Sequence, residues 1–426
     1  MELRLPYGRT SLAIDLPKER VLAVVEVPEG SPAPEEAVIH AALNAPVGAP
    51  PLGRLVRRGE RTTIVIPDAS RRCGAHVFLP LLLETLNRRG IQDQDITVLF
   101  ATGSHGPQSE AARREVLGPE VYGRVRAVDH DCWATSELVH LGQTVNGTQV
   151  WLHKYVVKAE RLLIAGGGGY HPLTGYAGGP KLLNPGCASL ETVFGSHSLG
   201  VDAEQGGLAA TCAPGIAERN PIYQDIIDSM KFVQVDFALH VLVDAQGRVR
   251  QACAGGLLPS WAKARQLADS LYRVPVAARA PLAIASCGGS PFDEDFVKSF
   301  RAMRNAASVV TDGGHLLLIA QCKGGIGGEH FLDFFAGQST KELARQLRRD
   351  YRSFGTTALG VRQLLTRIRV TMVGELDPEA AARIGLRVEP SLAAAVEQAM
   401  AQLRPGARIA VLPHAHLTLP IVEANP

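Results

Sequence analysis

Short apolar runs alternate with helical patterns along most of the chain, and this alternation constrains the fold more than any other feature. Runs rich in β-branched residues predict buried strands, which fall at residues 62–68, 96–103, 161–167, 281–287, 314–322, 370–375 and 407–413. Helical patterns lie between several of them, at 77–90, 109–118 and 293–310. Because strands that alternate with helices are typical of parallel sheets, the sequence predicts an α/β protein with mainly parallel sheets. The segment 240–255 is expected to add an antiparallel hairpin at one edge.

The chain is too long for one ordinary hydrophobic core. Its 426 residues suit two or three domains. The alternation of strands and helices begins again near Ala280, after a predicted helix at 259–273. We therefore expect one α/β domain over residues 1–274, joined by a C-terminal return at 411–426, and a second over 278–410. The active site is expected in the cleft between them.

Composition excludes several classes of protein. Lys and Arg number 44 and Asp and Glu number 42, a near balance that argues against a nucleic-acid or membrane-surface binder. No stretch reaches the roughly 18 apolar residues of a membrane span. The opening segment lacks the apolar core of a secretory signal, and the seven cysteines are isolated from one another. These features predict a cytoplasmic protein whose partner is a small molecule.

Polar side chains gather directly after three of the predicted strands. In chain order they are Asp68, Ser70 and Arg71, then Thr102, Ser104 and His105, then His171. Ligands of open α/β sheets bind at the carboxyl ends of strands, so these loops are expected to converge. Arg71 presents a planar fork that suits a carboxylate, although a local ion pair with Asp68 is an alternative. His105 taken alone is compatible with a structural role, whereas the glycines near His171 leave its ring accessible.

The segment 166–197 concentrates glycine around two histidines and one lysine. Its sequence, GGGGYHPLTGYAGGPKLLNPGCASLETVFGSH, fits neither the dinucleotide fingerprint nor the P-loop. Glycine lets a backbone approach a bulky ligand closely, so we expect the segment to cradle one. Lys181 is then either a phosphate contact or, if its pKa is lowered, a nucleophile toward a carbonyl carbon. A neutral His197 suits nickel, copper or zinc, best in a cofactor that supplies the other ligands.

Taken together, these motifs resemble the nickel-dependent lactate racemase family. That family pairs an Asp-x-Thr-Arg loop with an Ala-Thr-Gly-x-His loop, and this chain has DASR at 68–71 and ATGSH at 101–105. The family's second His lies ten residues before a Lys, and its metal-binding His lies sixteen residues after that Lys. His171, Lys181 and His197 keep both spacings. The resemblance continues through GGSPFDEDF and GGIGGEHF in the second domain, so it covers most of the chain.

The resemblance implies a nickel-pincer nucleotide, pyridinium-3,5-bisthiocarboxylic acid mononucleotide nickel, made by separate cofactor-synthesis proteins. Lys181 would tether it through a thioamide, and His197 would ligate the nickel. Further contacts to the cofactor would come from Ser70, Thr102, Gly103, Gly178 and Gly179. The α-hydrogen of a 2-hydroxy acid would leave as hydride, while His105 and His171 act as acid/bases on either side of the substrate. Asp68 and Arg71 would orient and bind that substrate.

Departures from the family pattern bear on the substrate. On the second-domain helix, lactate-specific members have Tyr-Gln and then Lys, where this chain has Val297, Lys298 and Arg301. We expect Lys298 and Arg301 to contact a 2-hydroxy acid larger or more polar than lactate, such as malate or an aldonate. The alternative is that Lys298 is a solvated helix residue. Two other functions stay open: a metal- or phosphate-assisted isomerase without the pincer, and a non-catalytic protein that binds a hydroxy acid or the cofactor.

Overall fold

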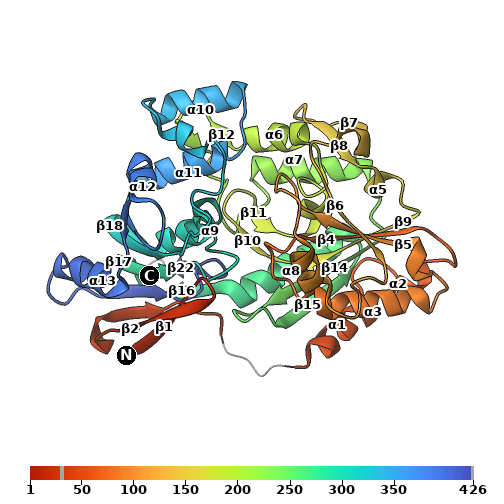
Figure 1. Ribbon diagram of the computed structural model, residues 1–426, viewed down its shortest axis with the longest axis horizontal. Coiled ribbons are helices and arrows are strands. Elements are labelled where there is room, and N and C mark those ends of the chain that lie inside the picture. Colours follow the sequence, from red (N-terminus) through yellow and green to blue (C-terminus); the bar gives the residue numbers. More distant parts are fainter. Residues whose placement is uncertain (29–32, 424–426) are drawn as a thin grey trace.

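Two six-stranded sheets organise the protein, as seen in a computed structural model that describes residues 1–28 and 33–423 (Figure 1). The strand order is β15-β14-β9-β4-β5-β6 in the first sheet and β20-β19-β18-β17-β21-β3 in the second. Every neighbouring pair in them is parallel except β14 with β15. The predicted α/β fold with mainly parallel sheets is therefore confirmed. No helix within the described ranges is long and apolar enough to cross a membrane.

The first sheet contains three predicted runs and the predicted hairpin, together with β6, which was not predicted. Its strands are β4 (Thr62–Pro67), β5 (Ile96–Ala101), β6 (Arg126–Asp129), β9 (Arg161–Gly167), β14 (Phe237–Val243) and β15 (Val249–Gly255). The last two form the expected antiparallel hairpin at the edge. One face is covered by apolar side chains of α1 (Glu35–Asn44), α2 (Leu52–Leu55) and α3 (Ala75–Asn87), and α4 (Glu110–Leu117) packs beside α3.

The opposite side of the first sheet carries the elements that surround the glycine-rich segment. They are β7 (Leu138–Gln143), β8 (Gln149–His153), α5 (Lys154–Val157), β10 (Gly169–His171), β11 (Gly175–Ala177), α6 (Leu190–Ser198), α7 (Pro221–Ser229) and α8 (Leu257–Tyr272). Strands β12 (Val201–Asp202) and β13 (Gly207–Leu208) pack instead against α10 (Thr340–Arg349) and α11 (Gly355–Leu365) of the second unit. The chain therefore leaves β9 at the carboxyl edge of the sheet and stays there through α6, which places the glycine-rich segment above that edge.

The second sheet begins where the alternation was predicted to restart. Its strands are β3 (Val21–Val24), β17 (Ala280–Ser286), β18 (Val310–Ile319), β19 (Arg369–Val373), β20 (Arg387–Glu389) and β21 (Ile409–Leu412). Its helices are α9 (Phe296–Ala306), α10 (Thr340–Arg349), α11 (Gly355–Leu365), α12 (Pro378–Ile384) and α13 (Leu392–Ala401). The predicted helix at 293–310 is shorter than expected because Asp295 caps α9, its side chain accepting a hydrogen bond from the Lys298 backbone N–H.

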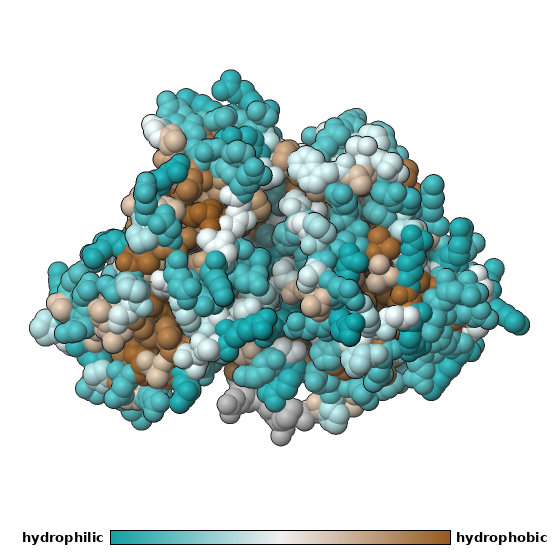
Figure 2. Space-filling model, viewed as in Figure 1, coloured by the Kyte–Doolittle hydropathy of each residue, from teal (hydrophilic) through white to brown (hydrophobic). Residues whose placement is uncertain are grey.

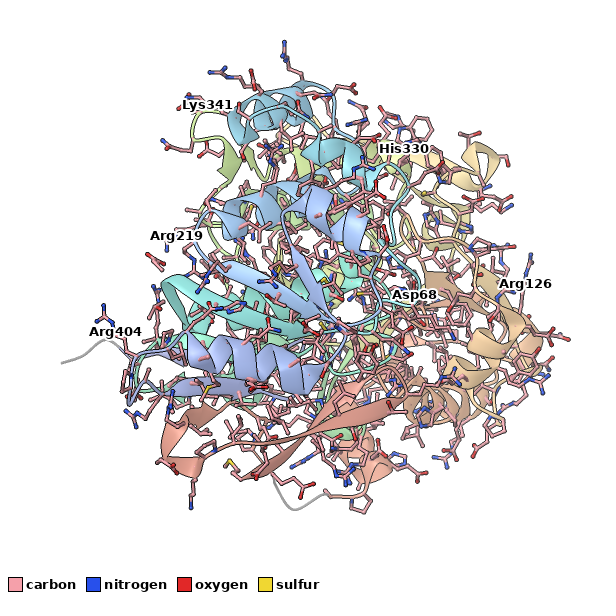
Figure 3. The ribbon with its side chains drawn as sticks, turned by 60° about the vertical axis from the view of Figure 1, so that its left-hand side comes forward. Asp68, Arg126, Arg219, His330, Lys341 and Arg404 are labelled. Atoms are coloured by element: carbon pink, nitrogen blue, oxygen red, sulfur yellow. The ribbon has the colours of Figure 1, made fainter. Side chains whose placement is uncertain are left out.

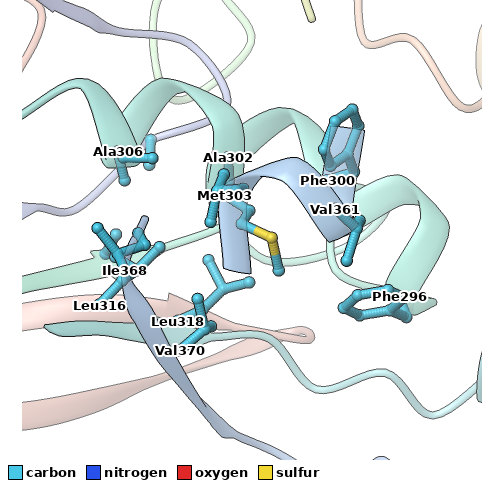
Figure 4. Packing of buried hydrophobic residues seen from close by; sticks show 14 of the residues in the cluster. Phe296, Phe300, Ala302, Met303, Ala306, Leu316, Leu318, Val361, Ile368 and Val370 are labelled. Atoms are coloured by element: carbon cyan, nitrogen blue, oxygen red, sulfur yellow. The ribbon is translucent and has the colours of Figure 1, made fainter. Parts of the chain in front are cut away.

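Helix α9 is fixed on this sheet by its apolar face (Figure 4). Phe296, Phe300 and Met303 are buried in one cluster with Leu316 and Leu318 of β18. The packing leaves a second face of α9 toward the first sheet. That face carries the three residues at which the chain departs from the lactate-specific pattern.

The N-terminal segment belongs with the second sheet, which corrects the expected domain limits. The hairpin of β1 (Glu2–Tyr7) and β2 (Thr10–Asp15) packs Leu5 and Ile14 against that sheet, and β3 pairs with β21. Assigning all of 1–274 to one domain was therefore wrong for these strands. The sequence of β3, a four-residue edge strand near the start of the chain, does not indicate which sheet it joins.

The predicted C-terminal return divides between the two units. β21 lies within the second sheet, whereas Leu417 and Leu419 join the cluster around Trp261 of α8. β22 (Leu419–Val422) pairs with β16 (Arg273–Val276) beside the connection between the units. Residues 424–426, the end of the predicted return, lie outside the described residues. We propose that one domain spans 35–272 and that the other combines 1–27 with 273–423.

Candidate active site

A cavity of about 320 Å³ lies between the loops of the two sheets. Figure 2 shows the surface hollowed between the two lobes of the molecule. The predicted residues that line the cavity are Asp68, Ser70, Arg71, Thr102, Gly103, His105, His171, Gly178, Lys181, His197, Lys298 and Arg301. Asp68 lies in the interior in Figure 3, whereas Arg126, Lys341 and Arg404 extend from the periphery. The loops after β4, β5 and β9 therefore converge, as their strand ends predicted.

Asp68 holds His105 in one orientation. β4 ends at Pro67, so the Asp68 carboxylate stands at the strand end, where its Oδ2 lies 2.6 Å from His105 Nδ1. Oδ1 accepts hydrogen bonds from the Ser70 hydroxyl at 2.5 Å and from its backbone N–H at 3.1 Å. Burial raises the pKa of Asp68, but the hydrogen bonds from His105 and Ser70 outweigh burial and hold that pKa below its ordinary value. The ionised carboxylate can only accept, so Nδ1 of His105 carries the hydrogen and Nε2 keeps a lone pair.

Two guanidinium groups, one from each unit, enter the cavity without carboxylate partners. Neither Arg71 nor Arg301 forms an ion pair within the described part of the chain, so the alternative pair of Arg71 with Asp68 does not form. Nη2 of Arg301 is buried without any hydrogen-bond partner. Burial, followed by the nearby charge of Arg71, lowers the pKa of Arg301 well below its ordinary value. The cavity is therefore built to receive an anion.

Lys181 presents a free amine to the same cavity. It lies in a short 3-10 helix, Gly179–Leu182, and its Nζ has no hydrogen bond or ion pair with the residues that the structure describes. Burial, with smaller effects from Arg71 and Arg301, lowers the pKa of Lys181 to about 7. A large fraction of the amine is therefore neutral, and nucleophilic, at physiological pH.

His197 presents a lone pair from the last turn of α6. Ser189 caps the start of this helix, and the Nδ1–H of His197 donates to the Val193 carbonyl oxygen at 2.9 Å. Burial, with the charge of Lys181, lowers the pKa of His197 to about 4, so the ring is neutral and its Nε2 is free to bind a metal. The ring of Tyr351, from the second unit, lies 6.4 Å away and covers this end of the cavity.

His171 ends β10 and stands in different surroundings from His105. Its Nδ1 accepts hydrogen bonds from the backbone N–H groups of Leu173 and Thr174, both at 3.2 Å. Burial first, then the charges of Lys181 and Arg301, lower the pKa of His171 well below its ordinary value. The imidazole is therefore neutral at physiological pH.

Several predicted contacts have other structural roles. The Thr102 hydroxyl donates to the His130 carbonyl oxygen, which leaves it no proton to donate to a ligand. Lys298 Nζ lies 2.6 Å from Glu294 and 3.0 Å from Asp295, so the charge expected to meet the substrate is already paired. The sequence carried a signal for this pairing, because Glu294 and Asp295 lie four and three residues before Lys298 on the predicted helix.

The two glycines before Lys181 are required by the conformation and packing of the backbone. Gly178 has φ +95°, and a Cβ there would collide with the Gly167 carbonyl oxygen. Gly179 has φ +57°, and a Cβ there would collide with the ring of Trp261. Gly179 does not line the cavity. Its expected contact with a cofactor is therefore replaced by a packing role that sets the position of Lys181.

Replacing Gly179 by alanine is expected to lower the free energy of unfolding by about 2–5 kcal/mol, since left-handed backbone costs roughly 1–2 kcal/mol and overpacking roughly 1–3. Urea denaturation measures the change. Gly59→Ala is the matched control, because Gly59 has φ +78° but nothing within 4 Å of a Cβ. A loss at Gly179 no larger than the loss at Gly59 would contradict the packing role.

The sequence did not reveal the aromatic residues that close the cavity. Tyr351 and Phe354 line it from the segment between α10 and α11, and Phe292 stacks on His416 with ring centroids 3.9 Å apart. The sequence hinted at these residues only by placing aromatic side chains in loops that are otherwise polar. His416 lies at the cavity wall, stacked on the Phe292 ring.

Comparisons with known proteins agree over most of the chain. The lactate racemase N-terminal domain family matches residues 7–207, and the lactate racemase C-terminal domain family matches residues 276–417. The lactate racemase of Thermoanaerobacterium thermosaccharolyticum is 28% identical over 336 residues, 78% of this chain and 77% of that protein. The lactate racemase of Lactiplantibacillus plantarum is 26% identical over 385 residues, 89% of each chain.

Solved structures share the fold. The lactate racemase apoprotein from T. thermosaccharolyticum matches with a TM-score of 0.88 and 24% identity, over 99% of this chain and 100% of that one. A protein from Thermotoga maritima matches with a TM-score of 0.70 and 14% identity, over 93% of this chain and 100% of that one. With both halves of the chain matched by the two domain families, the protein is an enzyme of the isomerase class and belongs to the lactate racemase family.

Proposed function

We propose that the protein racemises or epimerises a 2-hydroxy acid at its α-carbon. One observation carries the proposal: a neutral lysine amine, a free imidazole lone pair on His197 and a histidine held by Asp68 all face one cavity. The names of the two relatives, both lactate racemases, support it. A location in the cytoplasm, where the seven free cysteines would stay reduced, is part of the proposal.

The residues present fit a nickel-pincer nucleotide. The free amine of Lys181 suits a thioamide tether, and no carboxylate competes for it within the described chain. His197 suits the metal, since metal-binding histidines typically donate their other ring N–H to a carbonyl or carboxylate oxygen. When bound, the cofactor would supply a hydride acceptor, which avoids a carbanion beside the substrate carboxylate. The proteins that make this cofactor are the expected partners.

The chain's own residues would bind the acid and move its hydroxyl proton. Arg71 would hold the carboxylate, and Arg301 of the second unit faces the same cavity. His105, with Nε2 free, would take the hydroxyl proton as the α-hydrogen leaves as hydride. Tyr351 and Phe354 would exclude water and keep the transient keto acid in the cavity.

We further propose a substrate larger or more polar than lactate. Val297 replaces an aromatic residue of the lactate-specific pattern, and Arg301 brings a second unpaired guanidinium group. Malate or an aldonate would give that group a second anionic or hydroxyl contact. Because Lys298 is already paired, Arg301 is the cation on which this proposal depends.

Chiral analysis of a panel containing lactate, malate and gluconate tests the proposal on protein made together with the cofactor-synthesis proteins. Turnover of malate or gluconate above lactate supports the larger substrate, and turnover of lactate alone contradicts it. A loaded protein that converts no 2-hydroxy acid contradicts the racemase function itself.

Replacing Arg71 by methionine is expected to raise KM about 10- to 100-fold, because a hydrogen bond to a charged group contributes roughly 1.5–3 kcal/mol. Lys298→Met should raise KM much less, since its amine already faces Glu294 and Asp295. Steady-state kinetics on the preferred acid compares the two. Equal effects would show that Arg71 does not hold the carboxylate.

A further inference from the structure

A group of cationic and hydrogen-bonding side chains lines the cavity around His416. Burial, followed by the charges of His414, Arg301 and Arg72, lowers the pKa of His416 well below its ordinary value, so both guanidinium groups lie near its ring. Arg72 and Arg301 line the cavity, and neither forms an ion pair within the described ranges. Their positive charges are therefore not neutralised at this wall of the cavity.

The fold holds the His416 ring in place at this wall. Gly288 has φ +94°, and a Cβ there would collide with His416 Nδ1, so glycine is what leaves room for the ring. The ring stacks on Phe292, with ring centroids 3.9 Å apart and ring planes 18° apart. His416 is 7% exposed, and its Nδ1 is buried without a hydrogen-bond partner. The imidazole is therefore fixed in position and keeps unused capacity for hydrogen bonds.

Asp244 also lines the cavity, but its carboxylate is already engaged. Its Oδ1 accepts hydrogen bonds from the backbone N–H groups of Gln246 and Arg248, both at 3.0 Å, and its Oδ2 lies 2.8 Å from Arg248 Nη2. Guanidinium groups can only donate, so the wall offers donors that no described carboxylate takes up. A ligand group that only accepts, such as a carboxylate, suits this wall better than a chain of hydroxyl groups, which must also donate.

We propose that Arg301, His416 and Arg72 form a second anion subsite, which binds the distal carboxylate of a 2-hydroxy dicarboxylic acid while Arg71 holds the first carboxylate. The proposal rests on the proposed racemase function and narrows its substrate to a diacid such as malate, in place of an aldonate. Arg72 comes from the first unit, whereas Arg301 and His416 come from the second. The distal carboxylate would therefore bridge the two units across the cavity.

Such a subsite is compatible with inversion at the α-carbon. Turning the keto acid about the axis through its first carboxylate presents its other face while that carboxylate stays on Arg71. In an extended diacid the second carboxylate lies close to the same axis, so the turn would move it only sideways within the subsite. One subsite can therefore serve both enantiomers.

Calorimetric titration with succinate and butyrate, on protein made with the cofactor-synthesis proteins, measures the subsite directly. The two acids differ only in whether the chain ends in a carboxylate or in a methyl group, and neither has a hydroxyl group that could react. At constant ionic strength, wild type is expected to bind succinate at least about 10-fold more tightly than butyrate, the usual effect of one hydrogen bond to a charged group. Equal affinities would overturn the proposal.

Two substitutions locate the preference. Arg72→Met removes the charge and keeps most of the side-chain length, so it should weaken succinate binding about 10-fold or more and leave butyrate binding nearly unchanged. His416→Phe, which keeps a ring that can stack on Phe292, should also weaken succinate more than butyrate. Lys298→Met is the matched control, because it removes a cation of the same cavity that is already paired. It should leave the ratio of the two affinities unchanged.

The possible outcomes separate this subsite from the racemase function. An equal loss for both acids in Arg72→Met would place Arg72 at the first carboxylate. Unchanged succinate binding with less covalent adduct would assign Arg72 to the phosphate group of the nucleotide, and either result overturns the proposal. A preference for succinate in protein that racemises no 2-hydroxy acid would count against the racemase function and leave the subsite in place.

Discussion

Lys181→Ala protein made with the cofactor-synthesis proteins is expected to carry no covalent adduct and to have no racemase activity. The physical reason is that Lys181 combines a free amine with a pKa lowered to about 7, which leaves it able to attack a carbonyl carbon near neutral pH. The downward direction of this pKa shift is what makes the amine reactive. A lysine at its ordinary pKa of 10.5 would be protonated and unreactive under the same conditions.

Intact-mass and nickel analysis of wild type and variant measure this effect. The matched control is Lys298→Ala, which removes a second lysine of the same cavity whose amine is held by Glu294 and Asp295. It should keep the adduct mass and the nickel. An adduct that survives in Lys181→Ala would place the tether elsewhere.

Folded wild type that carries neither adduct nor nickel would contradict the pincer assignment. An isomerase that works without the pincer would then racemise its acid although the protein carries no covalent adduct. A protein that only binds a hydroxy acid would bind without turnover. The same preparation therefore separates all three functions.

His105→Ala is expected to lower kcat by about 10²- to 10⁴-fold, the usual contribution of a positioned acid/base group. Asp68 fixes the ring with Nε2 free, so Asp68→Asn should also lower kcat, because an amide no longer requires the hydrogen on Nδ1. Adduct mass and nickel content should be normal in both variants. A loss of activity would then report proton transfer and not cofactor loading.

Chiral assays on the preferred acid measure these losses. His140→Ala is a suitable control, since His140 is exposed on β7, away from the cavity, and bonds only Gln149 among the described side chains. It should leave kcat unchanged. A His105→Ala enzyme within a few-fold of wild type would remove His105 from the proton path.

Local patterns predicted the convergence of the site well. The carboxyl ends of β4, β5 and β9 were recognisable from the sequence, and parallel strands bring such ends to one edge. The spacing among His171, Lys181 and His197 then matched a family pattern, and all three face the cavity. The strand ends and the residue spacing are both local patterns within short segments, so they can be recognised in the sequence without the structure.

Contacts between distant segments were not predictable. The pairing of Lys298 is different, because Glu294 and Asp295 precede it by four and three residues, a local ion-pair spacing that the sequence itself contains. The collision that excludes a side chain at Gly179 comes from Trp261, far along the chain. The different hydrogen-bond partners of His105 and His171 likewise appear only in three dimensions.

The pairing of β3 with β21 has a consequence for how the protein is made. These neighbouring strands lie at opposite ends of the chain, so the second sheet is completed only when synthesis is nearly finished. Every strand of the first sheet, together with Lys181 and His197, emerges long before that. The nascent chain therefore exposes Lys181 and His197 before the residues that cover them have been made.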